Sequence, residues 1–525
     1  MSWQILLAMV IYMAVVILIG VVYAKKANKN SEAFFLGGRS LGPWVTAMSA
    51  EASDMSGWLL MGLPGLAYWC GLADAAWTAI GLAIGTYLNW LITSKRLRRY
   101  SIKANNSITL PDFFSNRFKE TKPVILMISA LFILIFFTVY AASCLVTCGK
   151  LFATLFDAPY ILMMLVGAFF VLLYTILGGF LAESVSDFMQ AIVMISALVI
   201  IVTICIFKAG GMAAITENAQ QIPGFLEFFG MASPETVEIS GEAVQTVTNE
   251  APNFGAAESY GFLTICSALA WGLGYFGMPQ VLLRFMAIRK EKELKSSRRI
   301  AVVWVVISLA VAVFVGIAGR HLFPIEHLTK SSAESIFITI STQFLPPLLA
   351  GFVMAGILAA TISSSDSYLL IAASSFSKNI YQGVFKKNAS DKSVMTMTRI
   401  TLLVITAIAI LIALDENSVI FSIVSFAWAG FGATFGPIML FSLFWKRTTK
   451  EGAVAGMISG GVMVFVWKLL ISQLGGVFEI YELLPAFIIS SIVIVVVSLL
   501  SKKPSKEIEE EFEAVRLGTE DVVDA

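Results

Sequence analysis

Long apolar segments alternate with short polar ones along nearly the whole chain. Each apolar segment holds roughly 20 residues or more, which is the length that an α-helix needs to cross a bilayer. The pattern therefore predicts an all-α polytopic membrane protein with thirteen transmembrane helices. The predicted spans are residues 3–24, 43–68, 74–94, 123–149, 158–178, 187–208, 260–285, 300–319, 346–376, 396–414, 418–444, 452–474 and 480–501.

Composition supports the same class. Hydrophobic residues make up 58% of the 525 residues and charged ones only 14%, whereas a soluble protein carries about 25% charged residues. No basic region precedes the first span and no small-residue cleavage site stands out after it. We therefore expect a retained span and not a signal peptide.

Charge in the connections predicts the orientation. The segment 209–259 carries seven glutamates and no lysine or arginine, and the turn expected at 179–186 carries no basic residue. By the positive-inside rule the N-terminus is outside and the C-terminus is cytoplasmic, which agrees with an odd number of spans. The basic residues are concentrated in the alternate connections, at 25–39, 95–122, 289–299, 386–392, 446–450 and 502–506.

The most unusual apolar segment is SAEASDMSGWLLMGLPG, residues 49–65, which contains Glu51, Asp54 and several helix-breaking glycines. Charge inside a bilayer persists mainly along a pathway or at a site, and irregular backbone there must be satisfied by protein or a water-filled cavity. Acids on a broken helix are the pattern expected for an ion and substrate site in a secondary transporter. The alternative is a kinked packing helix whose buried acid is bonded to a neighbour.

A second broken helix is expected at AWGLGYFGMP, residues 270–279. Five spans follow from the start of each broken helix, and because five is odd the two blocks enter the membrane from opposite sides. This is the arithmetic of an inverted-topology repeat, with the broken helices facing each other at the midplane. The predicted divisions are 1–42 (leading helix and cytoplasmic loop), 43–208 (first repeat), 209–259 (acidic extracellular loop), 260–444 (second repeat), 445–501 (two accessory helices) and 502–525 (solvated cytoplasmic tail).

A second polar cluster, ILAATISSSDSYLL at 357–370, lies inside another span. Hard cations prefer several oxygen ligands, and backbone carbonyls and hydroxyls from the two segments would supply five. The alternative is that these serines only hold helices together. The candidate sodium ligands are Ala52, Met55, Ala360, Ser363 and Ser364.

These motifs resemble the sodium:solute symporter family, and its proline-transporting branch in particular. The resemblance runs from FLGGRSLGPWVTAMSAEASDMSGWLLMGLPG through WGLGYFGMPQVLLRFMA and ILAATISSS to EGAVAGMISG. It covers nearly the whole chain apart from the 209–259 loop and the extreme C-terminus. It implies a leucine-transporter-type core in which sodium and substrate bind together at the midplane. It also implies sodium-coupled uptake of L-proline, with the same five sodium ligands.

The resemblance also assigns roles to other residues. Asp54 matches an essential carboxylate beside the sodium site, Ser56 a serine that couples ion and substrate, and Asp187 an acid on the inward sodium path or at a second cation site. Aromatic walls would bury the ring of proline, and amides freed at the helix breaks would bind its carboxylate. The residues matching the substrate pocket are Trp58, Gly62, Tyr140, Trp271, Tyr275 and Pro279.

Two acids depart from this simple pattern. Glu51 stands where the proline branch usually has a small neutral residue, and Asp366 is a further acid within a span. Each could bind a proton or a second cation, or could be paired structurally.

Sodium-coupled L-proline symport across a bacterial cytoplasmic membrane is thus the predicted function. Sodium is the only cofactor we expect, and nucleic acid or an obligate protein partner is not expected. The substrate could instead be another small zwitterion or a carboxylate, or the fold could serve a channel or sensor without coupled turnover. An intramembrane enzyme is not expected, because no His, Cys or Ser–base pair has nucleophile or metal spacing.

Overall fold

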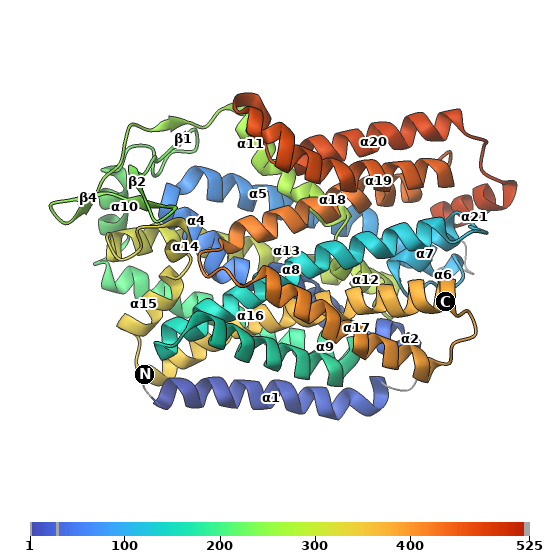
Figure 1. Ribbon diagram of the computed structural model, residues 1–525, viewed down its shortest axis with the longest axis horizontal. Coiled ribbons are helices and arrows are strands. Elements are labelled where there is room, and N and C mark those ends of the chain that lie inside the picture. The colour runs from blue at the N-terminus through green and yellow to red at the C-terminus, as the bar shows by residue number, and fades with distance from the viewer. Residues whose placement is uncertain (1–2, 28–30, 519–525) are drawn as a thin grey trace.

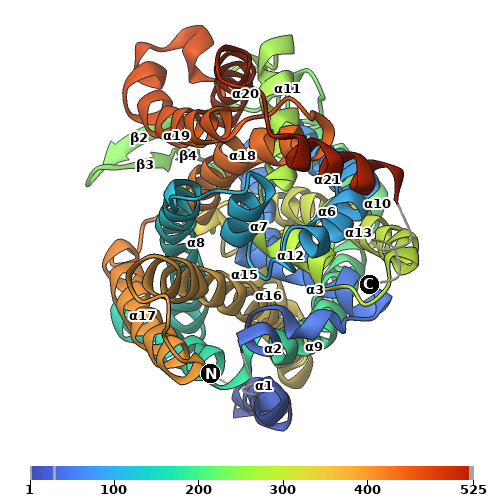
Figure 2. The same cartoon turned by 90° about the vertical axis from the view of Figure 1, so that its right-hand side faces the viewer.

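The computed structural model describes residues 3–27 and 31–518 as a bundle of helices. Most long helices run side by side along the longest axis of the molecule, and the end-on view shows them packed around α3, α12 and α16 (Figure 1, Figure 2). The long helices are α1 (Trp3–Ala27), α5 (Leu72–Leu88), α8 (Val124–Phe156), α9 (Tyr160–Lys208), α13 (Leu294–Leu322), α16 (Pro347–Ser374), α17 (Asp391–Ile412), α18 (Ile420–Phe444), α19 (Lys450–Val466) and α20 (Leu483–Leu500).

The helices confirm a polytopic membrane protein. Among the described residues, ten helices are long and apolar enough to cross a membrane, and the bent pair Phe262–Phe276 and Pro279–Ala287 would make eleven. The two other predicted spans, 43–68 and 158–178, are also helical. The first is interrupted, and the helix in the second, Tyr160–Ile176, is shorter than the rest.

Both predicted interruptions are present. In the first, α3 (Pro43–Gly57) leads through π-helical turns at Trp58–Gly62 into α4 (Leu63–Cys70). In the second, α11 (Phe262–Leu269) continues as a 3₁₀ segment at Ala270–Phe276, and α12 (Pro279–Ala287) then leaves at 42°. Proline at the first turn of α12 explains this restart, because its ring has no N–H and fixes φ at a helical value.

The turn expected at 179–186 is wrong for all but its first residue. The backbone of α9 leaves helical geometry at Gly179, where φ is 61° and ψ is 175°, a conformation that glycine adopts easily. Residues 180–186 are then helical. Their acid, Glu183, is buried against Arg284, so the charge in this segment lies inside a helix and not in a turn.

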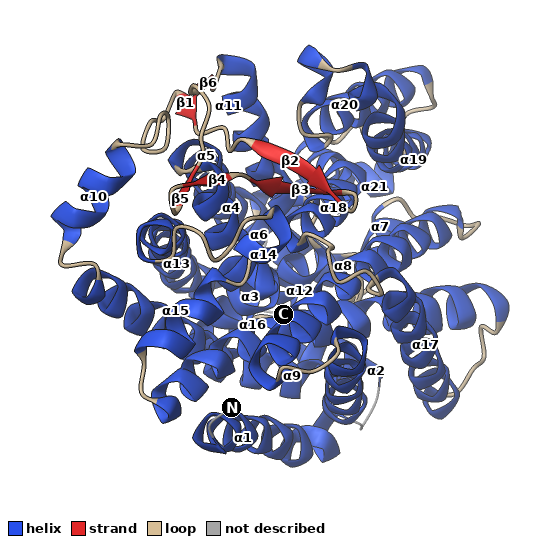
Figure 3. Cartoon of the chain, turned by 60° about the vertical axis from the view of Figure 1, so that its left-hand side comes forward, coloured by secondary structure: helices blue, strands red, loops and turns tan. Residues whose placement is uncertain are grey.

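The acidic segment 209–259 folds over one end of the bundle, which we call the outer end (Figure 3). Its backbone is tied to the helices, because the Leu72 amide donates to the Phe225 carbonyl at 2.8 Å and the Gln245 amide donates to Leu328 at 2.7 Å. Its elements are α10 (Met212–Gln220) and three antiparallel pairs: β1 (Gly230–Met231) with β6 (Glu258–Ser259), β2 (Thr236–Ile239) with β3 (Glu242–Gln245), and β4 (Val247–Thr248) with β5 (Ala251–Pro252).

The opposite, inner end carries the short helices of the basic connections and the C-terminal helix. The tail is not simply solvated as expected: α21 buries Ile508, Phe512 and Val515, and Lys119 pairs with Glu511 at 2.6 Å. Opposite charge and an apolar face therefore dock the helix, while residues 519–525 lie outside the described part of the chain. The elements concerned are α2 (Ser31–Leu36), α6 (Ser94–Lys103), α7 (Leu110–Arg117) and α21 (Lys506–Leu517).

A buried histidine between α13 and α14 (Lys330–Ala333) gives a pH prediction. His327 packs edge-on against Tyr68 and is hydrogen-bonded to Thr339 at 2.9 Å. Burial, and then the nearby Arg320 charge, lower the pKa of His327 from 6.5 to about 4. Between these values the unfolded chain binds more protons than the folded one, so the free energy of unfolding must decrease as the pH falls from 6.5 to 4.

Wild type should lose roughly 2–3 kcal/mol of its free energy of unfolding between pH 7 and pH 4.5 through His327, as the shift in its pKa implies. We expect His327→Gln to abolish this part of the loss. Thermal unfolding of purified protein at pH 7 and pH 4.5 measures it. An equal loss of stability between the two pH values in wild type and variant would contradict the assignment.

Candidate functional site

The two broken helices are joined at Asp54. Its carboxylate accepts a hydrogen bond from the Tyr275 hydroxyl at 2.8 Å and one from the Gln280 amide at 3.2 Å. Tyr275 belongs to the 3₁₀ segment and Gln280 to α12, so one acid of α3 bridges to both sides of the second break. Asp54 and Tyr275 were predicted from sequence, and Gln280 was missed. Pro279, also predicted, is buried at the start of α12 and sets the position of Gln280.

The predicted oxygen cage is the set Ala52, Met55, Ala360, Ser363 and Ser364. The Ser363 hydroxyl donates to the Ala52 carbonyl at 2.8 Å and lies 3.2 Å from the Ala360 carbonyl. The Ser364 hydroxyl reaches the same Ala52 carbonyl at 3.3 Å. Four of the five residues therefore meet between α3 and α16. Met55 is buried one turn further along α3, where its carbonyl accepts from the Trp58 amide.

The chemistry of the cage suits a hard monovalent cation. The oxygens that meet there are backbone carbonyl and side-chain hydroxyl oxygens, and all four meeting residues are fully buried. No group of three or more His, Cys, Asp or Glu residues that could hold a metal occurs among the described residues. Neutral oxygen ligands with no such cluster fit an alkali ion such as sodium better than zinc or iron.

Ser56 is the residue at which α3 leaves helical geometry, between the cage residues and the aromatic residues, and we call this position the hinge. Its φ is 48° and its ψ is −170°, which is a costly conformation for a residue with a side chain. Its hydroxyl accepts from the Trp58 amide at 3.2 Å. The break in α3 therefore lies between the cage residue Ala52 and the first aromatic residue.

Three aromatic rings close together above this hinge. The ring centroids of Trp58 and Trp271 are 5.7 Å apart, and those of Trp271 and Phe421 are 5.2 Å apart. At Gly62 an added Cβ would lie 3.1 Å from the Trp58 ring, so a side chain there would displace it. The predicted Trp58, Gly62 and Trp271 are thus adjacent, and Phe421 was missed.

Tyr140 lies apart from this aromatic group. Its ring stacks on Tyr368 at 4.3 Å, and the two hydroxyls reach the Asp54 carbonyl at 3.5 and 3.4 Å. These are long contacts by hydrogen-bond standards. Tyr140 and Tyr368 therefore face the backbone of the broken helix, on which substrate amide and carbonyl contacts would depend.

Of the three aromatic residues, Phe421 lines the floor of a cavity of about 490 Å³. Gly62 and Ser422 lie beside it there, and residues 231–234 and 236 of the outer segment contribute to the wall. The cavity is partly polar, as a passage for a zwitterion requires. It reaches the predicted pocket at Gly62, whose added Cβ would lie 3.1 Å from the Trp58 ring.

A buried ion pair between Lys150 and Glu334 holds Phe421 in position. Lys150 Nζ lies 2.8 Å from Glu334, whose carboxylate also accepts from the amides of Ile420 and Phe421, each at 2.9 Å. A carboxylate at the start of a helix satisfies its free N–H groups and its dipole. Glu334 thereby sets the position of Phe421 at the N-terminus of α18.

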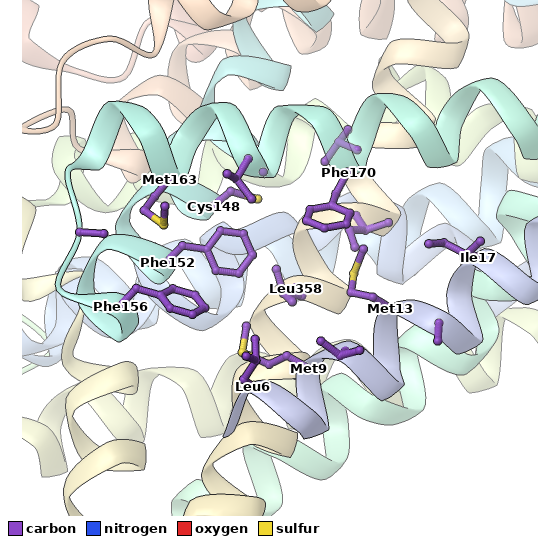
Figure 4. A pocket seen from close by; sticks show the side chains of 17 residues that line it. Leu6, Met9, Met13, Ile17, Cys148, Phe152, Phe156, Met163, Phe170 and Leu358 are labelled. Atoms are coloured by element: carbon purple, nitrogen blue, oxygen red, sulfur yellow. The ribbon is translucent and has the colours of Figure 1, made fainter. Parts of the chain in front are cut away.

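A larger cavity, of about 640 Å³, is an unsuitable substrate site. It is bounded by α1, α8, α9 and α16, and the side chains that point into it are hydrocarbon or sulfur groups such as Met9, Phe152 and Phe170 (Figure 4). A zwitterion placed there would lose its hydration without gaining hydrogen bonds, which costs several kcal/mol per group.

Asp187 has partners that sequence reasoning missed. Its carboxylate accepts from Ser49 at 2.7 Å and from Arg284 at 3.1 Å. Arg284 also pairs with Glu183. The predicted acid thus belongs to a buried charge cluster on the inner side of the cage.

The two unusual acids have one satisfied oxygen each. Glu51 accepts from the Trp90 indole at 3.1 Å, and Asp366 accepts from the amide of Ser367 at 2.7 Å. The second oxygen of each finds no hydrogen-bond donor among the described residues. Structural pairing therefore accounts for part of each side chain only.

Two solved structures of transporters have a similar fold. A Na⁺-coupled sialic acid symporter in a substrate-bound, outward-open state superposes with a TM-score of 0.74 at 17% identity, covering 96% of this chain and 99% of that one. A nucleobase-cation-symport-1 family transporter in a closed conformation superposes with a TM-score of 0.52 at 13% identity, covering 92% and 98%. At these identities the likeness shows a shared fold.

Sequence comparison shows the family. The sodium/proline symporter of Staphylococcus aureus strain USA300 / TCH1516 is 39% identical over 521 residues, covering 98% of this chain and 96% of that protein, and that of strain JH9 matches equally. The model of the sodium:solute symporter family matches residues 34–460. This multi-pass membrane protein is therefore a member of the sodium:solute symporter family, a sodium-coupled transporter and not an enzyme.

Proposed function

We propose that the protein takes up L-proline together with sodium by alternating access. The observation that carries the proposal is the dual contact of one short stretch of α3. The Ala52 carbonyl belongs to the oxygen cage, while Asp54, two residues later, is bonded to Tyr275 at 2.8 Å. An ion that orders this stretch also orders the substrate pocket. The 39% identity to sodium/proline symporters supports proline as the substrate.

The proposed pocket has groups for both halves of proline. Trp58 and Trp271 would cover the pyrrolidine ring. Backbone amides freed at the breaks would bind the carboxylate, and freed carbonyls would accept from the ammonium. Tyr140, which lies against the Asp54 backbone, would meet one charged end.

We also propose a topology of thirteen crossings, in which the interrupted 43–68 segment and the shorter Tyr160–Ile176 helix each cross the bilayer. Residues 43–208 and 260–444 would form two inverted repeats of the leucine-transporter type, with the N-terminus outside and the C-terminus cytoplasmic. The breaks at Ser56 and at residues 270–279 support this division, because each lies in the first helix of its repeat.

The transport cycle follows from these positions. Sodium from outside would occupy the five-residue cage and hold α3 and α16 together. Proline would then bind beneath Trp58, Trp271 and Phe421, and the bundle would open inward past Asp187. A membrane potential favours this uptake by about 2.3 kcal/mol per charge per 100 mV.

Reciprocal binding on purified protein tests this coupling. We expect sodium to tighten proline affinity and proline to tighten sodium affinity by the same factor, since linkage is symmetric. Proline affinity that is equal in sodium and in potassium would overturn the proposal. A competition panel of small zwitterions and carboxylates separates proline from related substrates, and accumulation against a gradient separates a symporter from a channel or sensor.

A further inference from the structure

Arg284 is a fully buried arginine that connects four segments. Its guanidinium donates to Ser49 of α3 at 2.9 Å, to Ser367 of α16 at 2.9 Å and to Asp187 of α9 at 3.1 Å. It also pairs with Glu183 of α9. Arg284 itself belongs to α12, so the cluster unites both broken helices with the helix that carries the cage serines.

The cluster lies next to the oxygen cage on its inner side. Ser49 precedes the cage residue Ala52 by three residues on α3, which starts from the inner end of the bundle. Ser367 follows Ser363 by four residues on α16, which starts from the outer end, and its hydroxyl donates to the Ser363 carbonyl at 3.0 Å. At 1.5 Å of rise per residue, Ser49 lies about 4.5 Å and Ser367 about 6 Å inward from the cage.

A gain in folding stability does not by itself explain why these charges are buried together. One guanidinium faces two carboxylates, and Glu183 Oε2 and Asp187 Oδ1 find no donor among the described residues. Buried ion pairs are seldom more stable than apolar packing of the same volume, because the charges lose their hydration. The guanidinium does, however, bond Ser49, Ser367 and Asp187 at once, so it lies directly inside the cage and joins the helices that would have to separate to open a path there.

We propose that Arg284 closes the inward exit of the sodium cage, and that it must part from Asp187 and Glu183 before sodium leaves toward the cytoplasm. While the cluster is intact, the ion meets a fixed guanidinium directly inside the cage. When α12 moves away from α9, the guanidinium leaves and the two carboxylates line the path. The proposal rests on the proposed sodium-coupled function, and it assigns to Arg284 a positioning role that keeps sodium from crossing without substrate.

Sodium leak in the absence of substrate tests the proposal. Arg284→Gln alone would leave two buried carboxylates without their partner, which is strongly destabilising. The paired variant Arg284→Gln/Glu183→Gln removes one charge of each sign and keeps hydrogen-bonding side chains of similar length. We expect radioactive sodium to leave proteoliposomes containing the paired variant at least tenfold faster than wild type without proline.

Two further variants make this result specific. Arg284→Lys keeps the charge, so its leak should stay within about twofold of wild type. Arg117→Gln neutralises another fully buried arginine, which bonds the Ser442 carbonyl at the inner end, and its leak should equal that of wild type. Retention of a trapped dye shows that the vesicles are intact.

The outcomes separate this proposal from the proposed function. A paired variant that holds sodium as tightly as wild type would overturn the role of Arg284. An equal leak in Arg117→Gln would also overturn it, because the effect would then be general damage. If the wild type shows no sodium-dependent proline binding, the proposed function is contradicted, whatever the leak measurements show.

Discussion

Replacing Asp54 by asparagine is expected to lower sodium-dependent uptake at least about 100-fold, or roughly 2.7 kcal/mol of transition-state stabilisation. The carboxylate accepts from both Tyr275 and Gln280. An amide has one acceptor oxygen, so one of these donors would face an NH₂ group and stay unsatisfied, at a cost of about 1–3 kcal/mol. The exchange also removes a negative charge two residues from the cage carbonyl of Ala52, which should weaken sodium binding.

The measurement is initial uptake rate against sodium concentration at equal amounts of inserted protein. Asp112→Asn is the matched control, because this carboxylate also accepts from a buried amide, Asn379 at 2.7 Å, but lies on α7 at the inner end. Its rate should stay close to wild type. Normal sodium activation in Asp54→Asn would show that the acid does not link ion and substrate.

Removing the cage hydroxyls gives the second large effect. Ser363→Ala and Ser364→Ala each delete one oxygen that meets the Ala52 carbonyl, at 2.8 and 3.3 Å. A hydrogen bond to a charged group contributes about 1.5–3 kcal/mol, and we expect one oxygen ligand to contribute a similar amount to the free energy of sodium binding. We expect each change to raise the half-saturating sodium concentration about tenfold or more, and the double variant about 100-fold, while the rate at saturating sodium falls less.

Uptake curves over a wide sodium range at constant ionic strength measure this shift. Ser374→Ala is the control, since among the residues that the structure describes its hydroxyl bonds within α16 alone, to the Ile371 carbonyl at 2.8 Å. If the half-saturating concentration in the double variant equals that of the control, the cage does not bind the transported ion.

The local features of the site could be predicted from sequence because they are properties of short segments. Clustered glycines, with proline, weaken a helix through backbone freedom and a missing N–H donor, so both breaks were visible at 49–65 and 270–279. Asp54 was visible as a charge within an apolar run. The serines of α16 were visible as a polar cluster at the expected depth, and the structure brings two of them to Ala52.

The partners of these residues could not be predicted, because they come from distant parts of the chain. Gln280 is 226 positions from Asp54, and Glu334 is 87 from Phe421. The residues that surround each partner in the sequence do not specify which distant residue it contacts. A signal for Arg284 was available: a strong cation inside a predicted span needs a counter-charge. The expected turn at 179–186 concealed one of its two counter-charges, because it placed Glu183 outside the span, while the other, Asp187, was assigned to the sodium path.

Uptake of radiolabelled L-proline into proteoliposomes tests the central claim most directly, with an inward sodium gradient compared with an equal potassium gradient. The account predicts transient accumulation above equilibrium with sodium only. Absence of proline uptake by demonstrably folded protein would contradict the substrate, and accumulation driven equally by potassium or by a proton gradient would contradict sodium coupling.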